Sequence, residues 1–486
     1  MTPEQTKILW GYLGAVAYVL FAIGIALLFY KLGLSKKYTR KIVHILVGFE
    51  WVILSQLMGA SYHFLIVCAV FTAALALSYF KHLLPAMSSD GENDPGTVYY
   101  GISMTVMASV CLFVPEMMLP FGIGVFCTSL GDGLAGVVGQ LVKKHNPRIF
   151  RGKSLLGTLT NLVTSFGVAV AFKYIYAMES LTLLHCLYIA IFSAGLELIG
   201  AFGLDNLMIT LGTAALTYAL IAYPVTVGYV APIIIAPYIV AAVIEKRALT
   251  AYGLLAALLL DLVTALAFGN LGFFVLISFF VGALAVDKVK KARRREDTIT
   301  KKEGTRDLIQ VIANGLVPMT MASIFIFWQH PAFLVGFVAS LAEAFADTVA
   351  SGMGVFSRTT YDIFKMRKCE CGISGGVSLV GTLSSLIASA LLSLYLFALG
   401  LGLSWIFFLI SFAASFLGVV FDSFLGSLFQ IKFKCSECGK ITERHVHCDK
   451  PTTHVQGFAF FDNDVVNLLS GVFSAAVAVA VCFVVL

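Results

Sequence analysis

Two stretches of the chain, about 220 residues apart, carry the same order of polar residues within otherwise apolar sequence. The shared order is an acid, a turn of small residues with Ser and Gly-Thr, a second acid, and an Asp-Asn pair. The first stretch contains Asp132, Gly152-Lys153-Ser154, Gly157-Thr158, Glu197 and Asp205-Asn206. The second contains Asp347, Ser374-Gly375-Gly376 with Ser378, Gly381-Thr382, Asp422 and Asp462-Asn463-Asp464. Because ionisable groups at bilayer depth are costly, a repeated set of them indicates two related active sites in one chain.

The first stretch has residue types that suit a metal and a phosphate. Asp132 is flanked by glycines, which let a bulky ligand approach the backbone, and its carboxylate is a hard oxygen ligand for Mg²⁺. Lys153 and Ser154 end a basic loop where the next helix is predicted to start, and the free N–H groups of a helix N-terminus favour phosphate. Glu197 and Asp205 lie on either side of a third predicted turn, and their carboxylates would complete a set of ligands around the metal and the phosphate. The alternative is that Asp132 and Glu197 only form hydrogen bonds between helices.

The second stretch offers the same turn without the lysine. Gly375-Gly376 precedes a predicted helix as Gly152-Lys153 does, so phosphate binding would depend on backbone N–H groups and on the hydroxyls of Ser374, Ser378 and Thr382. A site with several acids and few fixed cations depends on Mg²⁺ to neutralise phosphate charge.

The composition indicates a membrane protein. Hydrophobic residues make up 59% of the 486 residues and charged residues 12%, with 40 Phe. Apolar runs long enough to cross a bilayer recur along the chain and predict roughly sixteen spans. The basic residues gather in short connections, which places those connections, and with them the predicted sites, on the cytoplasmic face. The fold class is therefore all-α, a polytopic integral membrane protein. The net charge of +6 follows from these loops and requires no nucleic-acid partner.

The order of the spans predicts how the two stretches are related. Asp132 falls on the fifth predicted span and Asp347 on the thirteenth, and an even offset gives both halves the same orientation. The prediction is two parallel repeats of about eight helices, as domains 1–225 and 226–486, with a cytoplasmic Cys/His loop at 431–463. A transporter would instead place acids near the bilayer midplane in halves of opposite orientation.

Four motifs in the first half resemble the polyprenol kinases, the family that includes phytol kinase and dolichol kinase. The motifs, within residues 36–222, are Arg40-Lys41-Ile-Val-His44, Leu130-Gly131-Asp132-Gly133, Gly152-Lys153-Ser154 with Gly157-Thr158, and Glu197 with Asp205-Asn206. The resemblance implies phosphorylation of an isoprenoid alcohol with CTP or a related nucleotide. It also implies that Arg40, Lys41 and His44 bind substrate or nucleotide. Taken alone, His44 reads as a core or interfacial histidine.

The second half, residues 248–486, resembles a neighbouring family, long called a domain of unknown function, that includes plant phytyl-phosphate kinase. The motifs run from Gln310 to Asn467 and include Asn314, Phe345-Ala346-Asp347, Gly375-Gly376, Asp422-Ser423 and Asp462-Asn463-Asp464 with Asn467. The resemblance implies a binding role for Asn314, Asn463 and Asn467. The chain departs from the family pattern at Gly352, where a Glu is typical. Glu343, one helical turn before Asp347, is the candidate replacement.

A cysteine-rich loop predicts a structural Zn²⁺ site. Cys435-Ser-Glu-Cys438 has the spacing of a zinc knuckle, and His445 with Cys448 supplies a second pair. His447 is the alternative histidine. Cys369 and Cys371 are alternative ligands or disulfide partners.

Together these features predict a bifunctional kinase that phosphorylates a long-chain isoprenoid alcohol to the monophosphate and then to the diphosphate, with CTP or another nucleotide and Mg²⁺. Its ligands would be the isoprenoid lipid, the nucleotide and membrane lipids. The predicted catalytic residues are Asp132, Glu197, Asp205, Asp347, Asp422, Asp462 and Asp464. The alternatives are a kinase with one active site and a structural second half, a CTP-dependent lipid cytidylyltransferase, and a lipid-phosphate transporter.

Overall fold

The computed structural model describes residues 2–81, 95–142, 146–200, 203–223, 228–292, 305–399 and 404–486, without the side chains at 36, 37, 291 and 292. Parts of two predicted basic connections, residues 143–145 of the one at 143–153 and residues 293–304 of the one at 288–306, lie outside these ranges. The chain divides into two compact units, Met1–Lys246 and Arg247–Leu486. The helix Val230–Glu245 therefore packs with the first unit, whereas the predicted division at 225/226 assigned it to the second half. Separate activities for the two units stay a prediction.

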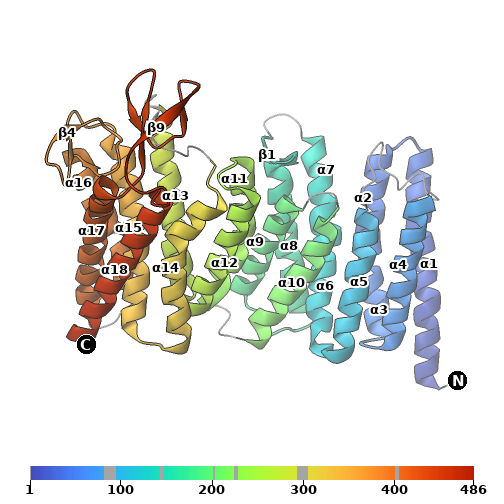
Figure 1. The fold of residues 1–486 in the computed structure, drawn as a ribbon. Helices are drawn as coiled ribbons and strands as arrows, with labels where there is room; N and C mark the ends of the chain where they lie inside the picture. Colours follow the sequence, from blue (N-terminus) through green and yellow to red (C-terminus); the bar gives the residue numbers. More distant parts are fainter. Residues whose placement is uncertain are drawn as a thin grey trace. The chain divides into compact units, whose positions relative to one another are not determined.

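The first unit is a helical bundle with one short β-hairpin at the end away from the N-terminus (Figure 1). Its helices are α1 (Pro3–Lys31), α2 (Lys36–Val47), α3 (Glu50–Leu57), α4 (Tyr62–Lys81), α5 (Gly96–Phe113), η1 (Pro115–Met117), α6 (Met118–Phe126), η2 (Cys127–Asp132), α7 (Gly133–Leu141), α8 (Leu155–Ile175), α9 (Leu183–Ile199), α10 (Asp205–Ala222) and α11 (Val230–Glu245). The hairpin pairs β1 (Arg148–Phe150) antiparallel with β2 (Lys153–Ser154). Trp51, packed on Phe126 and Phe172, lies in the core of this unit.

The second unit surrounds one buried helix with five others. Its helices are α12 (Ala251–Phe268), α13 (Asn270–Ala292), α14 (Leu308–Phe327), α15 (Pro331–Gly354), α16 (Leu379–Ser393), η4 (Leu394–Leu399), α17 (Ser404–Leu428) and α18 (Asn463–Val485). α15 packs against α13, α14, α16, α17 and α18. It is apolar on every side except at a few acids, as a helix buried on all faces must be. This position places Glu343 of α15 against α17 and α18, where a Cβ on Gly418 would come 2.5 Å from its Cγ and one on Gly471 3.8 Å from its Oε2.

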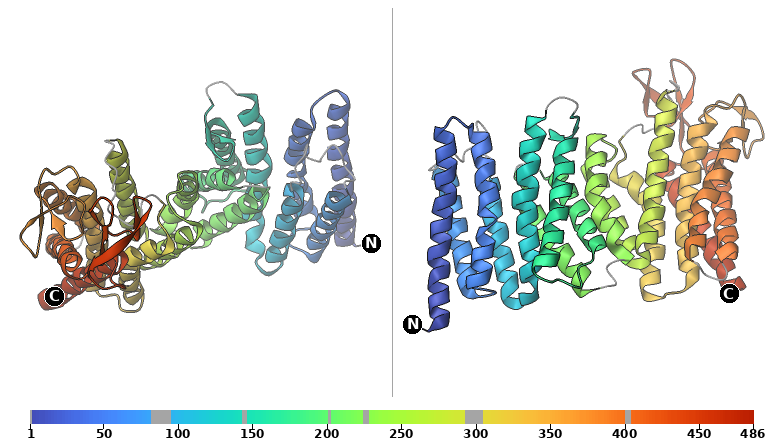
Figure 2. Two further views of the ribbon diagram at one scale, coloured as in Figure 1. Left: turned by 45° about the horizontal axis from the view of Figure 1, so that its top comes forward. Right: turned by 180° about the vertical axis from the view of Figure 1, so that it is seen from behind.

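Two small sheets lie at the end of the second bundle away from the C-terminus, as Figures 1 and 2 show from opposite sides. The first has the order β4-β3-β5, built from β3 (Thr360–Asp362), β4 (Lys368–Cys369) and β5 (Gly376–Val377). The second has the order β7-β6-β9-β8, built from β6 (Lys432–Cys435), β7 (Ile441–Thr442), β8 (Val446–His447) and β9 (Lys450–Gln456). All pairings are antiparallel. The predicted Cys/His loop is therefore a folded sheet.

The structure confirms an all-α polytopic membrane protein. Within the described residues, thirteen helical segments are long and apolar enough to cross a membrane, compared with roughly sixteen spans predicted. Two of the other predicted spans, α9 and α11, are apolar helices of 17 and 16 residues. The third, predicted at 42–58, is divided into α2 and α3 at Gly48-Phe49. Gly48 lies against Ser129, where an added Cβ would come 2.1 Å from the hydroxyl, so a close contact accompanies the break.

Candidate functional site

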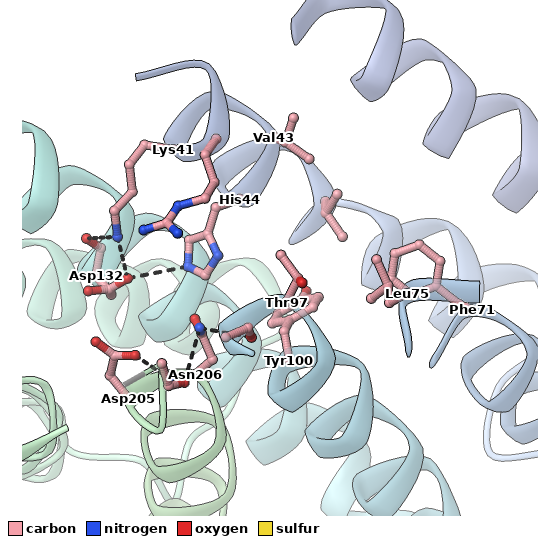
Figure 3. A pocket seen from close by; sticks show the side chains of 14 residues that line it. Lys41, Val43, His44, Phe71, Leu75, Thr97, Tyr100, Asp132, Asp205 and Asn206 are labelled. Atoms are coloured by element: carbon pink, nitrogen blue, oxygen red, sulfur yellow. Dashed lines mark hydrogen bonds and ion pairs between the residues drawn. The ribbon is translucent and has the colours of Figure 1, made fainter. Parts of the chain in front are cut away.

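Asp132 lies in the first unit at a break in helical geometry. It ends η2, a π-helical segment between α6 and α7, and such segments often occur at functional sites. The Asp132 Oδ2 atom is 2.7 Å from Lys41 Nζ and 3.5 Å from His44 Nε2, and Asp132 is only 3% exposed. His44 Nε2 also lies 3.0 Å from the Thr128 carbonyl oxygen. The motif on α2 and the acid about 90 residues later therefore meet, as Figure 3 shows.

Lys153 joins the two other acids of this unit. Its Nζ lies 2.8 Å from Glu197 Oε1 and 2.9 Å from Asp205 Oδ2, and Thr158 Oγ1 donates to Glu197 Oε2 at 3.2 Å. Burial alone would lower the pKa of Lys153, but the Asp205 and Glu197 carboxylates raise it well above its usual value. α8 begins at Leu155 after the cap residue Ser154, so Lys153 precedes the helix as predicted. It neutralises two acids, an arrangement that the sequence did not indicate, and its contact with a nucleotide stays a prediction.

A pocket beside Asp132 is polar on one side and apolar on the other. The polar side chains are Arg40, Lys41, His44, Asp132, Asp205 and Asn206, and the apolar ones include Val43, Val47, Phe71 and Leu75. Figure 3 shows Asp132, Asp205 and Asn206 gathered away from Phe71 and Leu75. Asn206 Nδ2 donates to the Gly96 carbonyl at 3.0 Å, while its buried Oδ1 has no hydrogen-bond partner among the described residues. This lining fits a ligand with a polar head and an apolar tail.

The turn before α8 and the turn before α16 have the same local geometry. Ser154 caps α8 by accepting from the Gly157 N–H at 3.2 Å, and Ser378 caps α16 by accepting from the Gly381 N–H at 3.2 Å. A Cβ on Gly157 would lie 3.2 Å from the Ala135 carbonyl, and one on Gly381 would lie 3.2 Å from the Ala350 carbonyl. Asp132 precedes Ala135 by three residues, as Asp347 precedes Ala350. Each acid thus holds the same place relative to a capped, glycine-packed helix start.

The two turns share a backbone feature, since Gly152 and Gly375 both have left-handed backbone, with φ of 85° and 82°. They differ in the exposure of their threonine side chains. Thr158 is buried against Glu197, whereas Thr382 is exposed. Among the described residues, no hydrogen bond joins Thr382 to an acid as one joins Thr158 to Glu197, and the binding role of Thr382 stays a prediction.

Three acids of the second unit lie close enough to interact electrostatically: Glu343, Asp347 and Asp422. Glu343 is buried, the other two are half-buried, and Ser470 Oγ donates to Asp422 Oδ2 at 3.3 Å. None of the three forms an ion pair within the described part of the chain. A Cβ on Gly418 would come 2.5 Å from Glu343 Cγ, so the glycine leaves room for that acid.

Of the candidate functional residues, Glu343 is the one for which the sequence gives least evidence. That evidence is its position one helical turn before Asp347. Gly352, the departure from the family pattern, packs on α13, where an added Cβ would come 2.1 Å from Val286 Cγ1. Since this contact leaves no room for a longer side chain, the structure gives the departure a packing reason.

The Asp-Asn residues at the start of α18 include the cap of that helix. Asp462 caps α18, with its Oδ1 accepting from the N–H groups of Asp464 at 3.2 Å and Val465 at 3.3 Å. Asn467 Nδ2 lies 3.5 Å from Asn314 Oδ1, and Asn463 Nδ2 lies 3.4 Å from Asn467 Oδ1. Asn314, Asn463 and Asn467 therefore lie together, and their binding role stays a prediction.

Three of the four predicted zinc-ligand candidates lie together, with His447, the alternative histidine, in place of His445. The ligand atoms of Cys435, Cys438, His447 and Cys448 all lie within 4.8 Å of one another. His445, the predicted ligand, instead packs on Phe433 with ring centroids 4.5 Å apart. All ten cysteines lie within the described residues and are free thiols, so the alternative disulfide with Cys369 or Cys371 is not formed.

Comparisons with known proteins agree with this fold. The family model described as integral membrane protein DUF92 matches residues 234–475. The chain is 35% identical to the phytol kinase of Synechocystis sp. over 221 residues. The aligned region covers 43% of this chain and 92% of that protein. It is 30% identical over 183 residues to an uncharacterized membrane protein of Methanocaldococcus jannaschii, covering 36% and 68% of the two chains. It is 29% identical over 241 residues to Protein VTE6, chloroplastic, of Arabidopsis thaliana, covering 48% and 64%.

No solved structure matches the chain. Its many apolar helices, with acids and a lysine gathered beside an amphipathic pocket, define a polytopic membrane protein with a buried polar site. The chain belongs to the polyprenol kinase-like family of integral membrane proteins.

Proposed function

We propose that the chain is a membrane-embedded isoprenoid kinase with two successive activities. The first unit would phosphorylate an isoprenoid alcohol such as phytol or geranylgeraniol, and the second would phosphorylate the resulting monophosphate. CTP would be the donor and Mg²⁺ the metal, with both sites on the cytoplasmic face. The reaction class is supported by the similarity to a protein named phytol kinase.

The observation that carries the proposal is the two-sided pocket beside Asp132. The first part of an isoprenyl chain would lie along Val43, Val47, Phe71 and Leu75, which would leave the hydroxyl at the polar side. To catalyse phosphoryl transfer, a protein mainly has to position the alcohol and the nucleotide and to stabilise the negative charge on the transferred phosphoryl group. Asp132 would accept a hydrogen bond from the alcohol, and Lys41, 2.7 Å from that carboxylate, would stabilise negative charge on the phosphoryl group.

The donor set of this pocket suits Mg²⁺. Asp132 and Asp205 contribute carboxylates to one lining, and the buried Asn206 Oδ1 is a further oxygen without a hydrogen-bond partner among the described residues. Mg²⁺ prefers such oxygens together with substrate phosphates. When bound, the ion would neutralise charge on the nucleotide phosphates. Lys153 would hold Glu197 and Asp205 in place through its two ion pairs.

The second unit would depend more strongly on a metal. Three acids close to one another, without an ion pair in the described ranges, are costly to bury unless a cation joins them. Glu343, Asp347 and Asp422 would supply its oxygen ligands. The Ser374-Gly375-Gly376 turn precedes the cap of α16, and that cap lies against the end of α15, where a Cβ on Gly354 would be 3.5 Å from Ser378 Oγ. The turn would receive phosphate oxygens through backbone N–H groups.

The test incubates the purified chain with Mg²⁺, phytol or geranylgeraniol, and CTP labelled at the γ- or the α-phosphate. A kinase transfers the γ label to the lipid, whereas a cytidylyltransferase would transfer the α label. We expect monophosphate and diphosphate from the unmodified chain, monophosphate alone from Asp347→Ala, and no product from Asp132→Ala. Unchanged diphosphate from Asp347→Ala would favour the alternative of one active site with a structural second half.

A further inference from the structure

The sheet β6–β9 contains a cluster of metal-ligand side chains that the reaction does not use. Cys435 ends β6 and Cys438 lies in the turn after it, while His447 ends β8 and Cys448 begins the turn between β8 and β9. Cys438 Sγ lies 3.5 Å from His447 Nδ1, and Cys448 Sγ lies 3.2 Å from the same atom. Ligands of a tetrahedral Zn²⁺ are separated by roughly 3.5–3.8 Å, given Zn–S of about 2.3 Å and Zn–N of about 2.0–2.1 Å. The two printed separations are close to this range, and all four ligand atoms lie within 4.8 Å of one another, a spacing that one zinc ion could bridge.

Two tight turns hold the backbone around the cluster. On one side, the Cys435 N–H donates to the Lys440 carbonyl at 2.9 Å, and the Gly439 N–H donates to the Cys435 carbonyl at 3.1 Å. On the other side, Cys448 has left-handed backbone, with φ of 53°. Asp449 follows with φ of 57°, so the two residues form the two-residue turn between β8 and β9, where positive φ at both positions is typical of a type I′ hairpin turn. This turn places Cys448 beside His447.

The same sheet is joined to the turn that precedes α16. Glu443, which follows β7, accepts hydrogen bonds from Ser374 Oγ and, at 2.8 Å, from Gln430 Nε2. Lys432 on β6 donates to the Ser374 carbonyl at 2.8 Å. Farther along, Gln456 at the end of β9 accepts from Lys365 Nζ at 2.8 Å. The position of the Ser374 turn therefore depends on the position of this sheet.

We propose that Cys435, Cys438, His447 and Cys448 bind one Zn²⁺, and that this ion fixes the sheet that holds Glu443 and Lys432 against the Ser374 turn of the second site. The sheet needs a metal ion to stabilise it because β7 and β8 have two residues each and β6 has four. Strands this short have little stability of their own. A closed site of four protein ligands is typical of structural zinc. The metal is thus a positioning element for the second site.

The metal content tests the first part without any activity. The full chain, purified in detergent, is expected to contain about one zinc per chain by elemental analysis, and Co²⁺ exchanged into it should give the absorption bands of a tetrahedral thiolate site. Cys438→Ser and His447→Asn should remove most of the metal. His445→Gln and Cys371→Ser, neighbours outside the cluster, should retain it. A chain without zinc, or full zinc in Cys438→Ser and His447→Asn, would overturn the proposal.

The second part rests on the proposed function and has two readouts. Cys438→Ser should slow conversion of monophosphate to diphosphate by about tenfold or more and leave alcohol phosphorylation within about twofold. Trypsin should cleave at Lys440 and Arg444 faster in Cys438→Ser than in His445→Gln, whether or not the chain is a kinase. Zinc loss with unchanged cleavage and unchanged diphosphate formation would contradict the positioning role. Zinc binding in a chain that phosphorylates no lipid would refute the proposed function and leave the zinc site intact.

Discussion

Lys153 offers the sharpest link between stability and the first site. Its side chain is 25% exposed, and its partners Glu197 and Asp205 are 4% and 14% exposed. Lys153→Met would leave two carboxylates without their cation. Removing one partner of a buried ion pair costs about 3–5 kcal/mol, and the partial exposure of Lys153 places the expected loss near the lower end, about 3 kcal/mol.

Thermal unfolding of the purified chain in detergent measures this loss. For a unit of this size, 1 kcal/mol corresponds to about 2–4 °C, so the first unit should unfold roughly 6–12 °C earlier. Adding Glu197→Gln to Lys153→Met removes one of the stranded charges and should restore part of the stability. Alcohol phosphorylation should stay at least about 100-fold reduced in the double variant, because the carboxylate arrangement is lost. Lys7→Met, at an exposed lysine of α1, is the control and should change stability by less than about 0.5 kcal/mol.

Unfolding of Lys153→Met at the temperature of the unmodified chain would refute the reasoning. So would a double variant that is less stable than Lys153→Met, because the stranded charge would then not be the cause.

Two further variants test the two sites separately. Gly136→Ala puts a Cβ 2.5 Å from Lys41 Cε and should lower alcohol phosphorylation about tenfold in a steady-state assay, whereas Gly167→Ala, with open space around its Cβ, should leave the rate unchanged. Equal rates in these two variants would show that the placement of Lys41 is unimportant. Glu343→Gln should reduce conversion of monophosphate to diphosphate by at least about 100-fold and retain alcohol phosphorylation, measured by chromatography of labelled lipid. Retained diphosphate formation would remove Glu343 from the second site.

The sequence predicted the fold class because apolar runs define membrane helices wherever they occur. Lys41 and His44 were candidates through the resemblance to the polyprenol kinases, and the structure brings them to Asp132. The break at Gly48-Phe49 could not be predicted, because it accompanies a close contact with Ser129 on another helix.

Contacts between distant elements were the part that the sequence could not supply. The ion pairs of Lys153 depend on how α9 and α10 approach β2, which spacing along the chain does not determine. The role of Glu343 depends on the rotation of α15 against α17 and α18. The choice of His447 over His445 depends on tertiary contacts: His445, which precedes β8, packs on Phe433, whereas His447 in β8 lies beside Cys438 and Cys448.

Supplying the isoprenyl monophosphate directly, with Mg²⁺ and γ-labelled nucleotide, tests the central claim of two successive sites most directly. The account predicts that Asp132→Ala still converts the monophosphate to labelled diphosphate, whereas Asp347→Ala does not. Failure of Asp132→Ala to form diphosphate, or its formation by Asp347→Ala, would contradict the account.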